Sequence, residues 1–313
     1  MLLHSRRPFL VIMALVLLLI SVAAMPKTPA FLNTHETDEP LMPGMPPVTR
    51  PDVLELKIRL SQLNLYDGPM DATYELLAQE AVKRFQKGFW LAPTGVVDLA
   101  TWRALGYGVE RPAQVVTGPP PEGFVTLEID MDKLQMTVLI DGKDWKTYTV
   151  AGGKWTTLTP VGEWKIVEKG YERGGAFGSR WMALDVPWGS YGIHGTNRPW
   201  SIGSYASAGC VRMFNEDVEE LYEIVPTGTP VIIRGPRPAL YFANPLRRGA
   251  VGPEVVLIQE RMRTLGFDPG ECDGQFGGRT EAQVRDVNSV FGTGDGGLVT
   301  DDVYTLLGIR GRY

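Results

Sequence analysis

The chain has 313 residues, a length that predicts two or three domains rather than one. Hydrophobic residues make up 44% and charged residues 21% of the sequence, which excludes wholesale disorder and a multi-span membrane protein. Acidic residues (36) outnumber lysine and arginine (31), so the attraction on which nucleic-acid binding depends is absent. Two cysteines and three histidines are too few for a disulfide scaffold or a cysteine-rich zinc site. We expect no nucleic-acid partner, no metal and no cofactor.

Residues 1–24 have the features of an export signal. Arg6 and Arg7 precede sixteen apolar or small residues, and the stretch ends Ser-Val-Ala-Ala, a spacing that signal peptidase accepts. Sixteen residues are fewer than the roughly 20 that span a bilayer. We therefore expect either a cleaved signal peptide or an uncleaved N-terminal anchor, which would be the only membrane contact. The remainder has 29 basic and 36 acidic side chains, a net charge of −7, and we expect it to be exported.

Clusters of proline and glycine divide the rest of the chain. Residues 25–51 contain seven prolines and no periodic apolar pattern, which is typical of an extended spacer. Two further clusters of structure-breaking residues indicate linkers at 108–122 and 236–244. The blocks that remain are 52–107, 123–235 and 245–309.

The first and third blocks repeat one another. Each has a helical apolar pattern, a turn rich in Asp, Gly and Pro, a second helical pattern, and a Gly-containing segment before a short third one. Both resemble the small three-helix peptidoglycan-binding module of wall hydrolases, which implies that each copy binds cell-wall polymer. A pair of helical spacers without a ligand is the alternative. The third block departs from the module at Thr300, where the first has Asp98, and at Asn288 in place of Gln86, so we expect weaker binding by the third block.

The alignment of the two repeats also indicates the role of one cysteine. Cys272 aligns with Met70 of the first block, at an apolar position beside a turn. This predicts a small core residue rather than a reactive thiol. A disulfide between Cys272 and Cys210 would have to join two domains, and we do not expect one.

In the middle block, apolar residues recur at every second position instead of at helical spacing. Apolar and polar residues alternate over 125–129 and 134–140, and Asp141-Gly142 predicts a hairpin turn into a third strand. We therefore predict a mainly antiparallel β domain. The whole chain is then a multidomain α+β protein, with this domain between two small all-α three-helix bundles.

The residues that carry chemistry gather in the same block. His194 is the one histidine after the leader and the spacer, and Cys210 follows sixteen residues later. An ordinary thiol is only a few per cent ionised at pH 7, so a nucleophilic cysteine needs a nearby base. Gly209 permits a tight turn that directs backbone N–H groups at an oxyanion, and Arg212 offers a fixed positive charge on the strand face of Cys210. Each residue alone is commonly structural, and their joint presence favours a nucleophilic site.

This window resembles the signature of the L,D-transpeptidase catalytic domain, the YkuD family: His-Gly-Thr at 194–196, a spacer, and Ser-x-Gly-Cys-x-Arg at 207–212. The resemblance covers about residues 123–234. It implies that Cys210 is the acylated nucleophile, His194 its general base and Gly195 the carbonyl that orients the imidazole. It further implies that Gly209 and Cys210 supply oxyanion-hole amides and that Ser207 and Arg212 bind substrate. Ala208 replaces a second histidine that many members have, so a one-histidine mechanism is implied.

The implied reaction is acyl transfer in peptidoglycan. Cys210 would attack the bond between the third residue of a stem tetrapeptide and its terminal D-alanine. A neighbouring stem amine would then resolve the thioester into a 3→3 cross-link, whereas water would make the enzyme an L,D-carboxypeptidase. The implied partners are peptidoglycan stem peptides and glycan, together with carbapenem-type inhibitors that acylate Cys210. A catalytically inactive wall-binding scaffold is the alternative.

Overall fold

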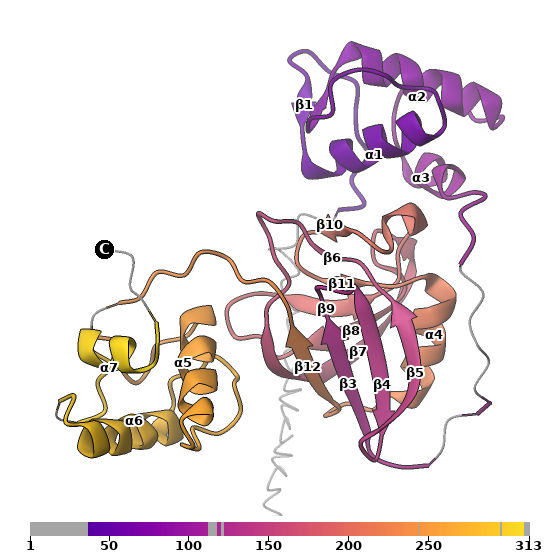
Figure 1. The fold of residues 1–313 in the computed structure, drawn as a ribbon. Coiled ribbons are helices and arrows are strands. Elements are labelled where there is room, and N and C mark those ends of the chain that lie inside the picture. Colours follow the sequence, from indigo (N-terminus) through magenta and orange to yellow (C-terminus); the bar gives the residue numbers. More distant parts are fainter. Residues whose placement is uncertain (1–36, 112–117, 120–121, 244, 295, 310–313) are drawn as a thin grey trace, which may run out of the picture. The chain divides into compact units, whose positions relative to one another are not determined.

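The computed structural model describes residues 37–111, 118–119, 122–243, 245–294 and 296–309. The leader predicted at 1–24, the start of the predicted spacer and part of the linker at 108–122 lie outside the described residues. Within the described ranges, no helix has the length and apolar character needed to cross a membrane. Their buried apolar side chains form a cluster for each predicted block. The predicted α+β organisation, with helical modules on either side of a β domain in the sequence, is confirmed (Figure 1).

The first module is a small helical bundle. Its elements are β1 (Val48–Thr49), α1 (Pro51–Gln62), β2 (Thr73–Tyr74), α2 (Leu76–Gly88) and α3 (Leu99–Leu105). Pro51 is the first residue of α1, where a missing N–H leaves no helical hydrogen bond unmade. Helix α3 begins after Asp98, whose carboxylate accepts the Thr101 N–H at 2.8 Å and so caps the helix.

The end of the predicted spacer belongs to this module. Leu41 is fully buried in its apolar cluster and exchanges backbone hydrogen bonds with Val97 at 3.1 and 3.0 Å. Strand β1 pairs antiparallel with β2. The spacer predicted for 25–51 therefore extends too far, because a proline-rich segment can contribute a buried side chain without a periodic pattern to reveal it.

The C-terminal module repeats the same plan. It contains α5 (Pro253–Thr264), α6 (Gly278–Phe291) and α7 (Asp301–Leu306). The amide of Asn288 donates to a carbonyl of the following loop at 2.8 Å, as the amide of Gln86 does at 2.7 Å in the first module. Thr300 precedes α7 without a side-chain capping bond, unlike Asp98 before α3. Asn288 thus replaces Gln86 in its bracing role, the missing cap at Thr300 is a difference within the bundle, and weaker wall binding by this module stays a prediction.

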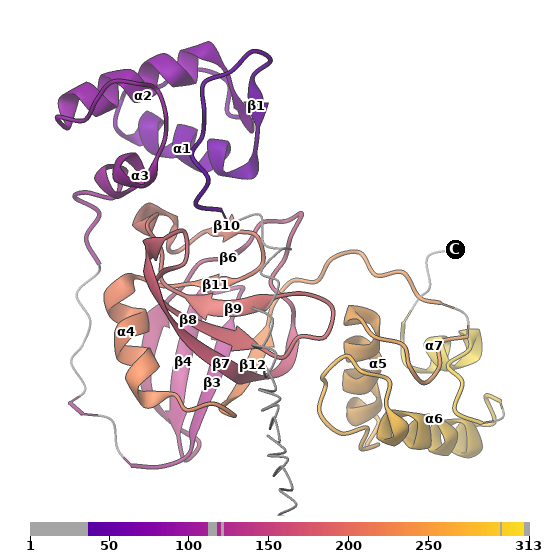
Figure 2. The ribbon, with the colours of Figure 1, turned by 180° about the vertical axis from the view of Figure 1, so that it is seen from behind.

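One large sheet forms the central domain. Its strands are β3 (Val125–Asp130), β4 (Gln135–Ile140), β5 (Lys143–Thr149), β7 (Gly162–Gly175), β8 (Gly178–Leu184), β9 (Tyr191–His194), β11 (Val211–Arg212) and β12 (Pro230–Arg234). Their order is β11-β9-β8-β7-β12-β3-β4-β5, with parallel pairing for β12 with β3 and for β11 with β9, and antiparallel pairing elsewhere. The described domain also contains β6 (Gly152–Gly153), β10 (Tyr205–Ser207), a short 3-10 helix η1 (Pro199–Ser201) and α4 (Asn215–Ile224). Helix α4 packs against β8 (Figure 2).

The predicted hairpin is confirmed. Strands β3 and β4 pair along their whole lengths, and β5 returns along β4. Asp141 and Gly142 have φ angles of +50° and +75°. A two-residue hairpin turn that follows the right-handed twist of the strands requires such positive angles at both positions.

The C-terminal module contributes to the core of the central domain. Val256 and Cys272 are buried in its apolar cluster. Glu163 of β7 donates its backbone N–H to the carbonyl of Cys272 and accepts the Cys272 N–H on its carboxylate, each at 3.0 Å. Lys165 and Glu271 add an exposed ion pair at 2.7 Å. Removing this module would expose part of the central core to water.

Candidate active site

A tight turn holds Cys210 just before β11. Gly209 has a φ of +124°, and a Cβ added there would lie 2.7 Å from the ring of Tyr191, so the turn requires glycine on both counts. The Ser207 hydroxyl accepts the Gly209 N–H at 3.0 Å and donates to the carbonyl of Cys210 at 2.6 Å. Serine at this position therefore fixes the turn that carries the cysteine.

His194 ends strand β9 in a fully buried position. Its Nδ1 lies 2.5 Å from the carbonyl oxygen of Gly195. A carbonyl only accepts, so Nδ1 carries the proton and the lone pair of the neutral ring lies on Nε2. The ring stacks on Trp181 with centroids 5.5 Å apart and meets the edge of Phe177 at 5.0 Å. The imidazole is thereby held in the tautomer and orientation of a base.

The register of β9 and β11 places Arg212 and His194 on one face. Arg212 is the parallel partner of His194, and residues two apart on a strand point to the same side. Cys210 lies in the turn two residues before Arg212, and the predicted approach of its thiol to His194 stays a prediction. Burial, and to a lesser extent Cys210, raises the pKa of the Tyr191 phenol, and the Tyr191 ring lies against the turn at Gly209.

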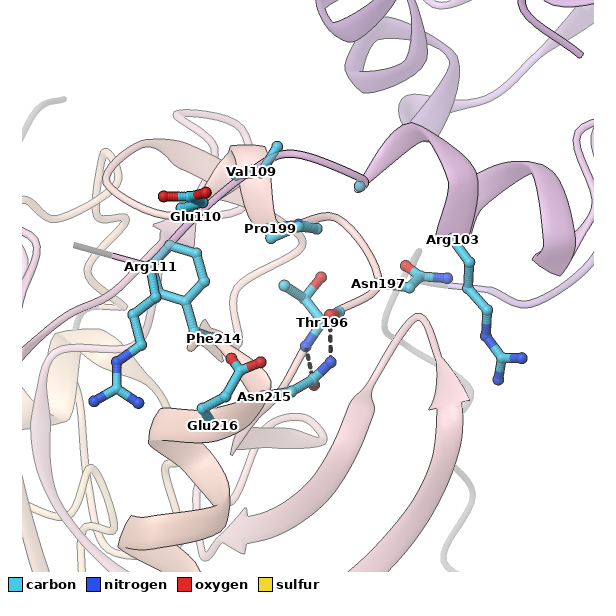
Figure 3. A pocket seen from close by; sticks show the side chains of 11 residues that line it. Arg103, Val109, Glu110, Arg111, Thr196, Asn197, Pro199, Phe214, Asn215 and Glu216 are labelled. Carbon is cyan, nitrogen blue, oxygen red and sulfur yellow. Dashed lines mark hydrogen bonds between the residues drawn. The ribbon is translucent and has the colours of Figure 1, made fainter. Parts of the chain in front are cut away.

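Asn215 is a positioning residue that the sequence did not reveal. At the start of α4, its Oδ1 accepts the backbone N–H groups of Ser179 and Thr196, and its Nδ2 donates to the carbonyl of Thr196, all at 3.1 Å. These bonds fix the loop that follows His194, and Figure 3 shows those to Thr196. Asn215 and Thr196 line a pocket of about 430 Å³. No periodicity connects an asparagine in a helix with a loop some twenty residues earlier.

Arg212 is buried, and a carboxylate of the first module binds it. The Arg212 guanidinium is 2.9 Å from Glu55 and 3.2 Å from the Ser201 hydroxyl. Arg198 approaches the same carboxylate at 3.5 Å. Burial alone would raise the pKa of Glu55, but Arg212 and then Arg198 lower it to about 2. The predicted contact of Arg212 with substrate stays a prediction.

Cys272 has the character of a core residue. It is 1% exposed, and burial raises the pKa of its thiol to about 12, against a smaller opposing effect of Arg263. Its thiol therefore stays neutral at physiological pH and is a poor nucleophile. Neither Cys272 nor Cys210 forms a disulfide in the described structure. Among the described residues, no group of His, Cys, Asp and Glu is arranged to hold a metal ion.

Replacing Cys272 with alanine should therefore leave enzymatic turnover intact. Removing a buried sulfur leaves a small cavity, and we expect the free energy of unfolding to fall by about 1 to 3 kcal/mol. Urea denaturation measures the free energy of unfolding, and covalent labelling of the Cys210 thiol measures whether the site is still reactive. Loss of labelling in a variant that is still folded would mean that the nucleophile has been misassigned.

Asp217 predicts a pH dependence of stability. It is 1% exposed in α4 and pairs with Arg111 at 3.0 Å, and burial raises its pKa to about 6 in spite of that arginine. At Asp217 the folded state then binds more protons than the unfolded state between pH 4 and 6, so the contribution of Asp217 to the free energy of unfolding should fall as pH rises through this window. Asp217→Asn should abolish the fall, whereas Glu216→Gln at the exposed neighbouring position should keep it. Urea midpoints at pH 4, 5, 6 and 7 measure the effect, and identical profiles for wild type and Asp217→Asn would contradict it.

The His-Gly-Thr segment begins at the end of β9, and the Ser-x-Gly-Cys-x-Arg segment ends on its parallel neighbour β11, so the two motifs that resemble those of the L,D-transpeptidase class lie on adjacent strands. Residues 125–233 match the model of the L,D-transpeptidase catalytic domain, YkuD. Residues 49–105 and 251–307 each match the "Putative peptidoglycan binding domain". The chain thus contains a catalytic domain of the YkuD L,D-transpeptidase family flanked by two peptidoglycan-binding modules.

Curated relatives match mainly over the central domain. The chain is 48% identical over 98 residues to "Putative L,D-transpeptidase YkuD" of Bacillus subtilis, which is 31% of this chain and 58% of that protein. It is 40% identical over 114 residues to "Putative L,D-transpeptidase YqjB" of the same organism, 32% of this chain and 65% of that protein. The chain thus spans between half and two thirds of the length of these relatives.

Two solved structures of L,D-transpeptidases show partial similarity to this chain. An L,D-transpeptidase from Xylanimonas cellulosilytica is 26% identical, with a TM-score of 0.31, over 59% of this chain and 94% of that one. The catalytic domain of the E. faecium L,D-transpeptidase is 25% identical, with a TM-score of 0.31, over 37% of this chain and 100% of that one.

Proposed function

We propose that this protein is a peptidoglycan L,D-transpeptidase that forms 3→3 cross-links through a thioester on Cys210. The observation that carries the proposal is the arrangement of His194. Its Nδ1 faces the carbonyl of Gly195, and its parallel strand partner is Arg212, two residues after Cys210, which supports a thiol within reach of the ring. A base with its lone pair on Nε2 beside a thiol is the arrangement that cysteine acyl transfer needs.

In the first half-reaction, Nε2 of His194 takes the proton of the Cys210 thiol. The thiolate attacks the carbonyl carbon of the third stem residue, and the N–H group of Cys210 stabilises the negative charge that develops on oxygen. The Gly209 N–H, which the sequence predicted as a second donor, is instead donated to the Ser207 hydroxyl. Collapse of this intermediate breaks the bond to D-alanine. The leaving amine takes the proton from His194, so the neutral base is restored.

In the second half-reaction, the side-chain amine of a neighbouring stem attacks the thioester. His194 removes a proton from the attacking nitrogen, and the Cys210 thiolate leaves and is then reprotonated. One peptide bond replaces another, so no energy-rich cosubstrate is required outside the cell. With water as the nucleophile, the same steps would give an L,D-carboxypeptidase.

The modules on either side match peptidoglycan-binding domains, and we propose that they hold the enzyme on its polymeric substrate. An exported enzyme in the cell wall fits this assignment, with a membrane contact only if the N-terminal segment is retained. The role would be cell-wall biogenesis and, through cross-linking, cell shape. Ala208 leaves His194 to carry every proton transfer.

The test is acylation of the purified protein by a carbapenem, followed by intact mass measurement and peptide mapping. We expect one adduct per chain, on Cys210, and release of D-alanine from a stem tetrapeptide in a parallel assay. Supplying a second stem with a free amine should give a 3→3 dimer by mass. The absence of both adduct and D-alanine release would favour the inactive wall-binding scaffold.

A further inference from the structure

A buried cluster of charges joins the first module to the central domain. The Glu55 carboxylate of α1 lies 2.9 Å from Arg212, 3.5 Å from Arg198 and 3.4 Å from Lys154. The side chains of Glu55, Arg198 and Arg212 are 6%, 1% and 1% exposed. One carboxylate thus holds cations from three segments of the central domain, one of which is the segment that carries Cys210.

The repeat shows that the helical bundle itself does not need this carboxylate. Helices α1 and α5 align residue for residue from Pro51 and Pro253, which places Glu55 opposite Leu257. Leu257 packs against the apolar cluster of its own module. A buried carboxylate is costly unless it is paired. Glu55 therefore stands at an apolar position of the repeat and is compensated by the arginines of another domain.

The two arginines have the chemistry of a carboxylate-binding site. A guanidinium is always charged, and its fork of N–H donors matches a carboxylate. Arg198 follows the His194 loop and Arg212 lies two residues after Cys210, so both belong to the segments that build the candidate active site. Asp52, at 3.7 Å from Arg198, is the more distant of the two acidic groups of α1. The donor stem of the proposed reaction ends in a carboxylate, that of D-alanine.

We propose that Arg198 and Arg212 form the binding site for the terminal carboxylate of the donor stem, and that Glu55 occupies it as an intramolecular ligand. The first module then acts as a cap, which must leave the arginines before a donor can bind. This inference rests on the proposed function.

The cap opens through competition from another carboxylate rather than through protonation of Glu55. The cations that surround Glu55 are Arg212, Arg198 and Lys154, and the carboxylate has its pKa lowered to about 2 by them against the effect of burial. Glu55 thus stays ionised throughout the pH range of a neutral or mildly acidic cell wall. A carboxylate ligand, or a polymer that draws the module away, is needed to open the site.

Two substitutions in the full-length protein test the cap. Glu55→Gln removes the charge, and Glu55→Leu introduces the residue of the C-terminal copy, which keeps the bundle compatible with folding. The matched control is Glu80→Gln, at a half-exposed position of α2 whose partner is Lys83. Each protein is assayed with a stem tetrapeptide and with the same peptide as its C-terminal amide. Hydrogen exchange of α1 and of residues 198–207 measures release of the module.

We expect both Glu55 variants to raise kcat/KM for the free acid at least fivefold, mainly through a lower KM, and to prefer acid over amide more strongly than the wild type. Exchange of α1 and of 198–207 should rise in both, and Glu80→Gln should match the wild type. Unchanged or lower kcat/KM in both Glu55 variants, with normal Cys210 adducts, would overturn the cap and make Glu55 a positioning residue for Arg212. If no protein forms an adduct or releases D-alanine, the proposed function fails instead. Unchanged hydrogen exchange of α1 and of residues 198–207 in both Glu55 variants would exclude release of the module.

Discussion

Cys210→Ala is expected to abolish both labelling by a carbapenem and release of D-alanine, with a loss in kcat/KM of at least about a thousandfold. The reason is that Cys210 is the thiol that we propose to lie beside the oriented imidazole of His194. The other cysteine, Cys272, is buried in an apolar cluster, with its pKa raised to about 12 by burial. Intact mass and a coupled D-alanine assay measure the loss.

Cys272→Ala is the matched control for this experiment, since it removes the other thiol of the chain. Binding of Cys210→Ala to insoluble peptidoglycan should equal that of the wild type, because the matched binding modules lie outside the central domain. Labelling that persists in Cys210→Ala would refute the assignment of the nucleophile. Parallel loss of wall binding would argue against separate binding modules.

His194→Gln should lower the acylation rate at pH 7 by about a hundredfold to ten-thousandfold, the usual contribution of a positioned base. Glutamine keeps a polar side chain at the end of β9 but cannot accept the thiol proton. Above the ordinary thiol pKa of about 8.5 the cysteine ionises without help. The rate of the variant should therefore recover in part as pH rises, while that of the wild type rises less steeply.

The pH profile separates catalysis from folding. A merely structural role for His194 would lower the rate at every pH and lower the melting temperature with it. We expect an unchanged melting temperature within a few degrees and a rate deficit that shrinks above pH 8.5. A uniform deficit at all pH values would exclude His194 as the base.

The C-terminal module needs a different experiment from simple truncation. Deletion of 245–313 would remove Val256 and Cys272 from the central core as well as the wall contact. Loss of activity in such a protein would report exposed apolar surface rather than a role in binding. Surface substitutions on α6 or α7 therefore test wall binding more cleanly.

Local pattern was sufficient for the architecture and for the residues of the chemical motif. Helical periodicity, repeated once, identified both modules, and alternation around Asp141-Gly142 identified the hairpin. These features depend on neighbours within about twenty residues, which is the range over which periodicity and turn chemistry act. The His-Gly-Thr and Ser-x-Gly-Cys-x-Arg segments named His194 and Cys210 as candidates for the same reason.

Contacts between distant segments were decided by the tertiary structure alone. Nothing in the local pattern joins Leu41 to Val97, Cys272 to β7, or Asn215 to the loop after His194. Glu55 left one signal, a carboxylate at the position where the other copy has Leu257, but its partners Arg198 and Arg212 lie well over a hundred residues away. Long-range burial is what turns these residues into ion pairs and core contacts. The sequence by itself therefore determined which groups are available for chemistry, and only the folded chain decided which of them are paired, buried and held in place.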